Sequence, residues 1–170
     1  MTTLTTALTP ERIRDLLREV KDPEVPVLDI VEMGLVRDVV VEDRDVRVDI
    51  TPTYSGCPAM EVIESEVRDT LAAHGIHGAT VRRVFAPAWT TEWMTDEARE
   101  KLRAYGIAPP GRGPVHPVEP LGFGPTVRAV PCPFCGSPDT VLESTFGSTA
   151  CKSLHRCEAC HQPFEHFKPH

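Results

Sequence analysis

Apolar side chains recur at helical spacing near the start of the chain. The positions that share one helical face are Ile13, Leu16, Leu17 and Val20. Thr9 suits the N-cap position, and Pro10 suits the first helical position because its missing N–H costs no hydrogen bond there. Asp22 precedes a proline, which disfavours helical geometry at residue 22. The pattern predicts a helix that begins at Pro10 and ends before the segment 22–26, Asp-Pro-Glu-Val-Pro.

Between residues 34 and 51 the apolar positions change to a period of two, which is typical of strands. In the first run, one face of the strand carries Leu35, Arg37, Val39 and Val41. In the second run, Val46, Val48 and Ile50 alternate with polar residues. The polar segment 42–45 between the runs predicts a tight connection. We therefore expect a hairpin with one face more apolar than the other.

A second helical pattern covers residues 58–74, and its core stripe consists of Met60, Ile63, Val67 and Leu71. Gly75 follows, where a helix would end. Residues 79–85 alternate again and predict a third strand, and a last helix is expected over 96–105 with Thr95 as its cap. The order α-β-β-α-β, with a crossover helix before the third strand, predicts an α/β (α+β) fold with a three-stranded mixed sheet.

The composition changes at residue 106. Seven prolines and several glycines fall within residues 106–131, and such a segment cannot form a helix or a central strand. Cysteines gather in the residues that follow. We therefore predict a first domain over residues 1–105, a partly extended linker over 106–131 and a small second domain over 132–170.

The negative net charge of the chain argues against two classes of partner, nucleic acid and anionic membranes. The 170 residues carry a formal net charge of −7, and 41% of them are hydrophobic. An acidic chain is not attracted to nucleic acid or to an anionic membrane surface. No stretch approaches the roughly 18 apolar residues of a membrane span, and the first residues do not resemble a secretory signal. We expect a cytoplasmic protein whose six cysteines are reduced and serve as ligands, reactive thiols or core residues.

Four cysteines form the most specific motif. Cys132 and Cys135 make one C-x-x-C pair, and Cys157 and Cys160 make another. Two such pairs supply four thiolates to one tetrahedral ion, and all four positions are then filled by protein. We predict a zinc ribbon with a structural Zn²⁺; a rubredoxin-like iron or an iron–sulfur cluster is the alternative. So small a module needs the metal for most of its stability.

Two further features of the second domain are weaker. Its basic residues Lys152, Arg156 and Lys168 are outnumbered by acidic ones, so nucleic-acid binding by the ribbon is not supported. Cys151 is left over from the two pairs. We favour a small buried residue over a reactive thiol, because free cysteine is commonly buried.

Cys57 is the only cysteine in the first 131 residues. If Pro58 is the first helical residue, Cys57 is the N-cap, where the N–H groups and the helix dipole lower a thiol pKa. An inert buried thiol is the alternative. No histidine lies in the loop to serve as a base, so nucleophilic catalysis is poorly supported. Ligation of a metal needs only the thiolate.

Several segments resemble known families. "DPEVPVLDIVEMGLVRDV" and "TPTYSGCPAM" resemble the small domain shared by the SufT-like proteins and the eukaryotic cytosolic iron–sulfur assembly factors. Together with "PAWTTEWMTDEAREKLRAYGIAPP" and the "FGSTACK" ribbon, they resemble the D-type (also J-type) subunits of the ring 1,2-phenylacetyl-CoA epoxidase system of aerobic phenylacetate degradation. The family often has Asp where this chain has Glu32, so an acidic group is retained.

The resemblance implies an accessory protein without catalytic activity of its own, beside the epoxidase (a monooxygenase). It would assist assembly or insertion of an iron–sulfur cluster, with the iron–sulfur reductase component as partner and client. Cys57 would be the ligand for a transient cluster, with Asp22, Glu24, Thr53 and Ser55 as possible support. One thiolate cannot hold a cluster alone, so a client, a second copy of the chain in a homodimer or another carrier would complete the site.

Two rival hypotheses remain open at this point. The chain could be a structural or regulatory subunit of the oxygenase complex, with the ribbon as its docking surface. It could also be a thiol enzyme that uses Cys57. A stoichiometric requirement in each turnover would favour the first rival, and a covalent intermediate on Cys57 would favour the second.

Overall fold

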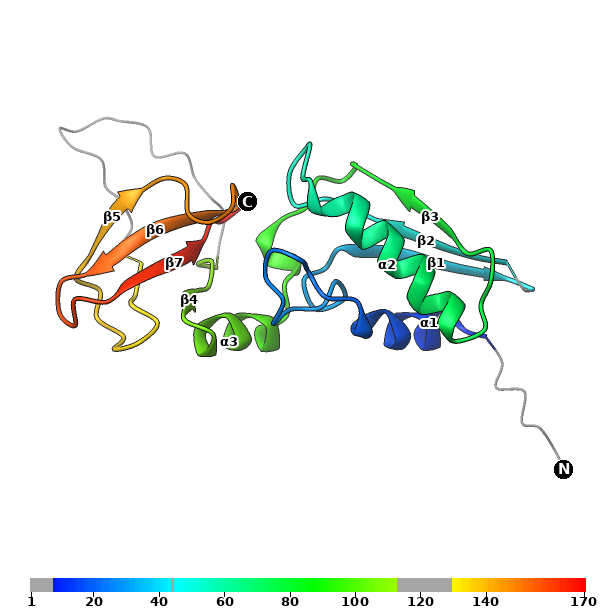
Figure 1. Cartoon of the computed structure of the whole chain (residues 1–170), viewed down its shortest axis with the longest axis horizontal. Coiled ribbons are helices and arrows are strands. Elements are labelled where there is room, and N and C mark those ends of the chain that lie inside the picture. Colours follow the sequence, from blue (N-terminus) through cyan, green and yellow to red (C-terminus); the bar gives the residue numbers. More distant parts are fainter. Residues whose placement is uncertain (1–7, 44, 113–129) are drawn as a thin grey trace, which may run out of the picture. The chain divides into compact units, whose positions relative to one another are not determined.

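Figure 1 shows the computed structural model of the chain, which describes residues 8–43, 45–112 and 130–170. The chain divides into two units, Met1–Trp89 and Thr90–His170. The first unit contains α1 (Pro10–Leu16), β1 (Val36–Glu42), β2 (Asp45–Ile50), α2 (Ala59–Ala73) and β3 (Thr80–Arg83). A 3₁₀ turn over Leu17–Glu19 extends α1. The predicted α-β-β-α-β order is confirmed.

The first unit is a three-stranded mixed sheet with strand order β1-β2-β3. β1 pairs antiparallel with β2, and β2 pairs parallel with β3, as the crossover through α2 requires. α1 packs against β1, and α2 packs against β3. The buried core residues of the two helices include Ile13, Leu17, Ile63, Val67 and Leu71.

The strict alternation predicted for the first strand is wrong at its start. A register shift lies between Val36 and Asp38, so this part of β1 is bulged. As a result Leu35, Val36 and Val39 are all buried, although they do not share one face of a regular strand. The periodicity could not reveal the bulge because every residue around it is compatible with a strand.

The loop between α1 and β1 is held by reciprocal side-chain bonds. The Asp29 carboxylate accepts from the backbone N–H groups of Val31 and Glu32, at 3.0 and 2.8 Å. The Glu32 carboxylate accepts in return from the N–H of Asp29 at 2.8 Å. This is the geometry of a capping box, and it gives the Glu32 side chain a structural role in this loop. The Trp89 indole N–H also bonds this region, through the Met33 carbonyl at 3.0 Å.

The second unit contains α3 (Asp96–Ala104), β4 (Ile107–Ala108), β5 (Thr140–Ser144), β6 (Lys152–Cys157) and β7 (Pro163–Phe167). Its sheet has the order β4-β7-β6-β5. β5, β6 and β7 are antiparallel neighbours, and β4 joins β7 in parallel. Thr95 caps α3 by accepting from the N–H of Ala98 at 3.1 Å, as predicted.

The division after Trp89 differs from the predicted boundary at residue 105. α3 belongs to the ribbon unit because it contacts β4, which pairs with β7, and because the Thr90 hydroxyl before it donates to the His170 carbonyl at 2.8 Å. The buried guanidinium of Arg99 bonds the carbonyls of Thr91 and Pro110, each at 2.6 Å, and so ties α3 to its own flanking segments. Two residues of the predicted linker, Ile107 and Ala108, form the edge strand β4. A proline-rich segment can supply an edge strand because one side of that strand needs no partner. Residues 113–129 of the predicted linker lie outside the described residues.

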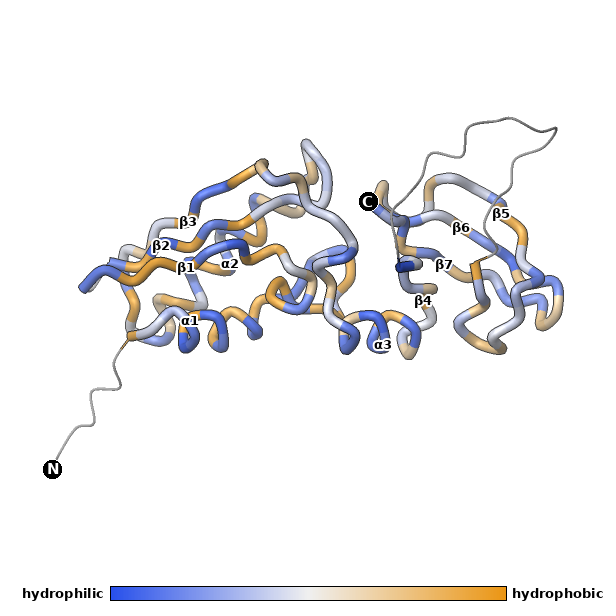
Figure 2. Tube along the Cα trace, turned by 180° about the vertical axis from the view of Figure 1, so that it is seen from behind, coloured by the Kyte–Doolittle hydropathy of each residue, from blue (hydrophilic) through white to orange (hydrophobic). Residues whose placement is uncertain are grey.

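Figure 2 shows the hydropathy along the chain: β1 carries stretches of the apolar colour, whereas α3 is mostly hydrophilic. Across the described ranges, no helix has both the length and the apolar character that crossing a membrane requires.

Candidate metal centre and candidate thiol site

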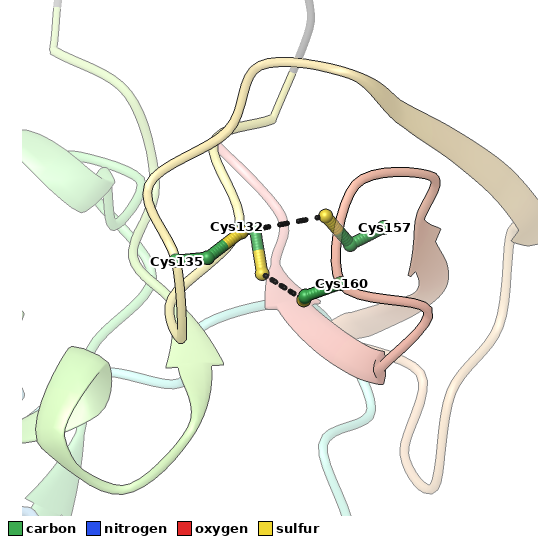
Figure 3. A group of neighbouring side chains, drawn as sticks. All are labelled: Cys132, Cys135, Cys157 and Cys160. Carbon is green, nitrogen blue, oxygen red and sulfur yellow. Dashed lines mark hydrogen bonds between the residues drawn. The ribbon is translucent and has the colours of Figure 1, made fainter.

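The four ribbon cysteines converge, as the two C-x-x-C pairs predicted. Their sulfur atoms all lie within 4.8 Å of one another, and together they form the metal-ligand group found among the described residues. Figure 3 shows Cys132 facing Cys160 and Cys135 facing Cys157. The two marked sulfur–sulfur distances are 3.7 and 3.6 Å.

These distances test the fit to a metal ion. A disulfide has a sulfur–sulfur distance of about 2.05 Å, so neither pair is bonded. Tetrahedral zinc with Zn–S bonds of about 2.3 Å places its sulfurs about 3.8 Å apart. The observed 3.6 and 3.7 Å therefore match the edges of a four-thiolate tetrahedron. All four donors are soft sulfurs, the ligand type that selects zinc or iron over magnesium or calcium.

The four thiols differ in how readily they ionise. The pKa of Cys157 is lowered to about 7, chiefly because the backbone N–H of Cys160 bonds its sulfur. The N–H of Gln162 favours the Cys160 thiolate, but burial and the three neighbouring sulfurs outweigh it and raise the pKa of Cys160 to about 12. Four sulfurs this close cannot all be negative near pH 7 unless a positive ion binds them.

The two cysteine pairs lie on equivalent turns. The N–H of Gly136 donates to the Cys132 carbonyl, and the N–H of His161 donates to the Cys157 carbonyl, each at 2.9 Å. Gly136 and His161 both have positive φ, 76° and 60°. This left-handed residue closes each turn and directs the following backbone N–H groups toward the sulfurs. Behind them lies a small apolar cluster that includes Cys132, Cys157, Ala108 and Phe164.

A buried ion pair, which the sequence pattern did not predict, holds the loop between β5 and β6. The ammonium of Lys152, on a buried side chain, lies 2.9 Å from the carboxylate of Glu165. The same carboxylate accepts from the N–H of Ser148 at 2.5 Å. A Cβ at Gly147 would lie 2.6 Å from a Glu165 oxygen, so a larger residue there would displace this carboxylate from its present position. The "FGSTACK" motif contains Gly147 and Lys152, but Glu165 is distant in sequence.

The other ribbon residues follow the sequence predictions. Cys151 is buried, as predicted, and its sulfur lies 3.0 Å from the Thr149 hydroxyl. Arg156 pairs with both Glu143 and Glu158 at 2.8 Å. Together with the Lys152 pair, this neutralises much of the positive charge that nucleic-acid binding would require.

Cys57 lies in the loop that follows β2, but it is not the N-cap of α2. The helix begins at Ala59, and Pro58 occupies the N-cap position with φ −68° and ψ −23°. The Cys57 carbonyl accepts from the N–H of Met60 at 3.3 Å, which forms a turn just before the helix. The prediction was wrong by one residue because proline is compatible with either position.

The environment of the Cys57 sulfur does not lower its pKa, contrary to the prediction. Its pKa is raised, first because the side chain is partly buried and also because the carboxylates of Glu24 and Asp22 act on it. Bonds from the backbone N–H of Ala59 and the hydroxyl of Thr53 favour the thiolate but do not offset these effects. The helix terminus does assist the thiolate, as predicted; the sequence argument could not weigh burial and two nearby carboxylates against it.

The predicted supporting residues are therefore brought together only in part. Asp22, Glu24 and Thr53 all act on Cys57. Asp22 also forms the turn proposed as its alternative role, since one of its oxygens accepts from the N–H groups of Glu24 and Val25 at 2.8 Å. Ser55 is exposed in the same loop and is not among the groups that shift the Cys57 pKa.

In the comparison with known proteins, two family models match separate regions of the chain, one in each unit. Residues 10–84 match the family model "Iron-sulfur cluster assembly protein", and residues 122–168 match "PaaD zinc beta ribbon domain". The chain is 46% identical over 153 residues to a protein of Escherichia coli (strain K12), the putative D-type subunit of 1,2-phenylacetyl-CoA epoxidase. The alignment covers 90% of this chain and 88% of that protein. The chain belongs to the family of D-type epoxidase subunits.

Other relatives of this D-type family member match about half of the chain. An "Fe-S protein maturation auxiliary factor" of Porphyromonas gingivalis (strain ATCC BAA-308 / W83) is 36% identical over 96 residues, covering 55% of this chain and 90% of that protein. A crystal structure of a domain of unknown function, DUF59, from Bacillus anthracis has a TM-score of 0.52 and 31% identity. It covers 55% of this chain and 90% of that one. The family resemblance and the fold class inferred from the sequence are thus confirmed.

Proposed function

We propose that this D-type family member is a non-enzymatic maturation factor of the phenylacetyl-CoA epoxidase system. In this proposal, Cys57 binds an iron–sulfur cluster transiently and passes it to the iron–sulfur reductase component. The match of residues 10–84 to the iron–sulfur cluster assembly family supports this role. The likeness to the D-type epoxidase protein of E. coli, which covers nearly the whole chain, supports the pathway.

The observation that carries the proposal is the isolation of Cys57. It is the only cysteine among the first 131 residues, and it lies partly exposed in a loop. A cluster commonly needs four ligands, so one thiolate holds it only together with other molecules. Transfer then proceeds by ligand exchange: the bond from Cys57 sulfur to iron breaks as a client thiolate bonds the same iron, with no net oxidation. An incomplete site suits a protein that must release its cargo.

For the ribbon we propose one structural zinc ion held by Cys132, Cys135, Cys157 and Cys160. The sulfur–sulfur distances and the match to a zinc beta ribbon domain support this assignment. When bound, the ion neutralises thiolates and joins the two turns. It takes no part in the exchange at Cys57, because four protein ligands leave no open position on the ion.

The name of the E. coli relative favours a second candidate function, a permanent subunit of the oxygenase complex. Epoxidase reconstituted from purified, cluster-loaded components distinguishes the two. A maturation factor is dispensable in that assay. A requirement in stoichiometric amount for each turnover would favour the permanent subunit and contradict the maturation role.

The direct test measures iron and acid-labile sulfide in the reductase component produced in cells that contain wild-type protein, Cys57→Ser or no protein. We expect the serine variant to keep its fold and zinc but to load the reductase no better than cells without the protein, since a serine oxygen is a poor soft-metal ligand. Growth on phenylacetate should fail in parallel. Cys151→Ala, which removes a buried thiol of the other unit, should load normally. Wild-type loading by Cys57→Ser would refute the proposal.

A further inference from the structure

The two edges of the three-stranded sheet differ in how far side chains cover their backbone groups. At the β1 edge, the guanidinium of Arg14 donates to the carbonyls of Val36 and Arg37 at 3.3 and 3.5 Å. The Asp38 carboxylate accepts from the N–H of Val39 at 2.9 Å. Side chains therefore occupy polar backbone groups along β1. Such cover is how proteins prevent a further strand from pairing.

The β3 edge has no comparable cover among the described residues. In β3, Thr80, Arg82 and Arg83 are exposed and Val81 is half-buried. The N–H of Val84 donates to the Ile50 carbonyl at 2.8 Å. This bond shows which residues of β3 direct their backbone groups toward β2 in the parallel pairing. Residues 80, 82 and 84 thus direct their backbone groups toward β2. Because successive residues of a strand bond to opposite sides, Val81 and Arg83 direct their N–H and C=O groups away from the sheet.

This edge also carries surplus positive charge. Asp49 pairs with two guanidiniums, Arg82 at 3.0 Å and Arg47 at 3.4 Å. Glu64 likewise pairs with Arg83 at 2.6 Å and Arg68 at 3.6 Å. Four cations thus pair with two carboxylates, and Asp38 also acts on Arg82, which still leaves more positive than negative groups here although the chain as a whole has a net charge of −7. A segment that docks here is favoured if it is acidic.

The free edge leads toward Cys57. β2 and β3 are parallel, so the loop that contains Cys57 and the segment that follows β3 leave the sheet at the same end. The Arg83–Glu64 pair connects the end of β3 to the early part of α2, whose first turn follows Cys57. Two residues beyond Arg83, Phe85 is 59% exposed and offers an apolar anchor. The exposed run continues through residue 88.

We propose that the free edge of β3 binds an extended, acidic segment of the protein that receives the cluster, which adds to the sheet as a fourth strand. The inference rests on the proposed function, because it identifies how the recipient is held beside Cys57. Backbone bonds to Val81 and Arg83 supply affinity, and the arginines and Phe85 supply selectivity. A second copy of this chain fits less well, since antiparallel pairing of two β3 strands would bring their arginines together.

The first test uses the wild-type protein, so no variant has to fold. Overlapping 12-residue peptides that cover the reductase component are added to the ¹⁵N-labelled full-length chain, and amide exchange is followed by NMR. With an acidic peptide bound, the amides of Val81 and Arg83 should be protected at least tenfold. The amide of Arg82, already bonded to β2, should change little. Protection at β1 or β5 instead would overturn the proposal, as would protection by a single-stranded oligonucleotide but by no acidic peptide.

The second test removes the backbone N–H of residue 81, which points away from the sheet. Val81→Pro deletes an N–H that the β2–β3 ladder does not use, and proline is tolerated at such an edge position. We expect at least tenfold weaker peptide binding and reduced reductase loading. Val81→Ala, which trims the same side chain but keeps the N–H, should bind within about twofold of wild type. Equal binding by the proline and alanine variants would refute docking at this edge.

Cys57→Ser separates the two proposals. The serine variant should bind peptides like wild type and yet fail to load the reductase. If it loads the reductase, the proposed function fails, while the exchange and proline measurements still decide whether the edge binds the segment.

Discussion

The two units of this chain are stabilised in different ways. The first buries aliphatic side chains from two helices, from β1 and β2 and from the loop before β1. The second has a sheet whose apolar cluster is small and includes the metal-ligand cysteines themselves. Burial of apolar area therefore stabilises the first unit, while a bound ion has to supply much of the stability of the second. In the proposed function, the same residue type, cysteine, is then a structural ligand in one unit and an exchangeable ligand in the other.

The largest effect is expected from removing the metal. Structural zinc in small modules contributes about 10 kcal/mol or more of apparent binding free energy, which is also folding free energy. Cys132→Ser or a strong chelator should therefore unfold the ribbon strands while the first unit keeps its secondary structure. Metal analysis together with NMR spectra of both units checks this. Full zinc content and an intact ribbon in serine variants of all four cysteines would show that the ligands are misassigned.

The next largest effect is expected from a cavity in the core of the first unit. Ile63 is buried on the face of α2 that packs on the sheet. Ile63→Ala leaves a cavity and should lower the free energy of unfolding of this unit by about 3 kcal/mol. Val62→Ala, on the exposed side of the same helix, should cost less than about 0.5 kcal/mol. Denaturant titration measures both, and similar costs at the two positions would contradict the assigned core.

A smaller effect concerns acid stability of the ribbon. Burial, reinforced by His155 and Lys168, lowers the pKa of His166 from 6.5 to about 4. The unfolded chain therefore binds a proton between these values that the folded ribbon does not. This contribution to stability is present above pH 6.5 and is lost as the pH falls toward 4.

The matched variant for this prediction is His166→Asn, which cannot take up the proton. Thermal melts of the zinc-loaded protein at several pH values should show a weaker decline between pH 6.5 and 4.5 in the variant than in wild type. Parallel declines would mean that protonation of the cysteine ligands alone accounts for the acid sensitivity.

The smallest effect is expected when the ribbon unit is deleted. A fragment that ends at Trp89 retains the bond from its indole to the Met33 carbonyl and all three strands of the sheet. Its melting temperature should stay within a few degrees of that of the first unit in the full chain, with a cooperative transition. A fragment that ends at Pro110 should melt no higher, because it adds only α3 and β4, which belong to the ribbon unit. A molten product at Trp89 would contradict the division.

The first unit was the more predictable in secondary structure, because its elements have strong local signals. Thr9 caps α1, the stripe of α2 is buried, and β3 follows the crossover helix, all as the pattern indicated. The ribbon was predictable in chemistry rather than in structure. Spacing alone brought four sulfurs together, whereas β4 and the clamp of Glu165 on the "FGSTACK" loop arise from contacts between distant residues.

The sequence by itself determined the helix caps, the period of each element, the two C-x-x-C pairs and the isolation of Cys57. These features depend on neighbouring residues or on the number of residues of one type, so they can be known without the fold. Only the tertiary structure decided the ionisation of Cys57, because the carboxylates of Asp22 and Glu24 reach it from another loop. It likewise decided which sheet edge is covered, since Arg14 comes from α1 and the four arginines near β3 from three different elements. Charges and backbone groups act through space, and their distances do not follow from position in the chain.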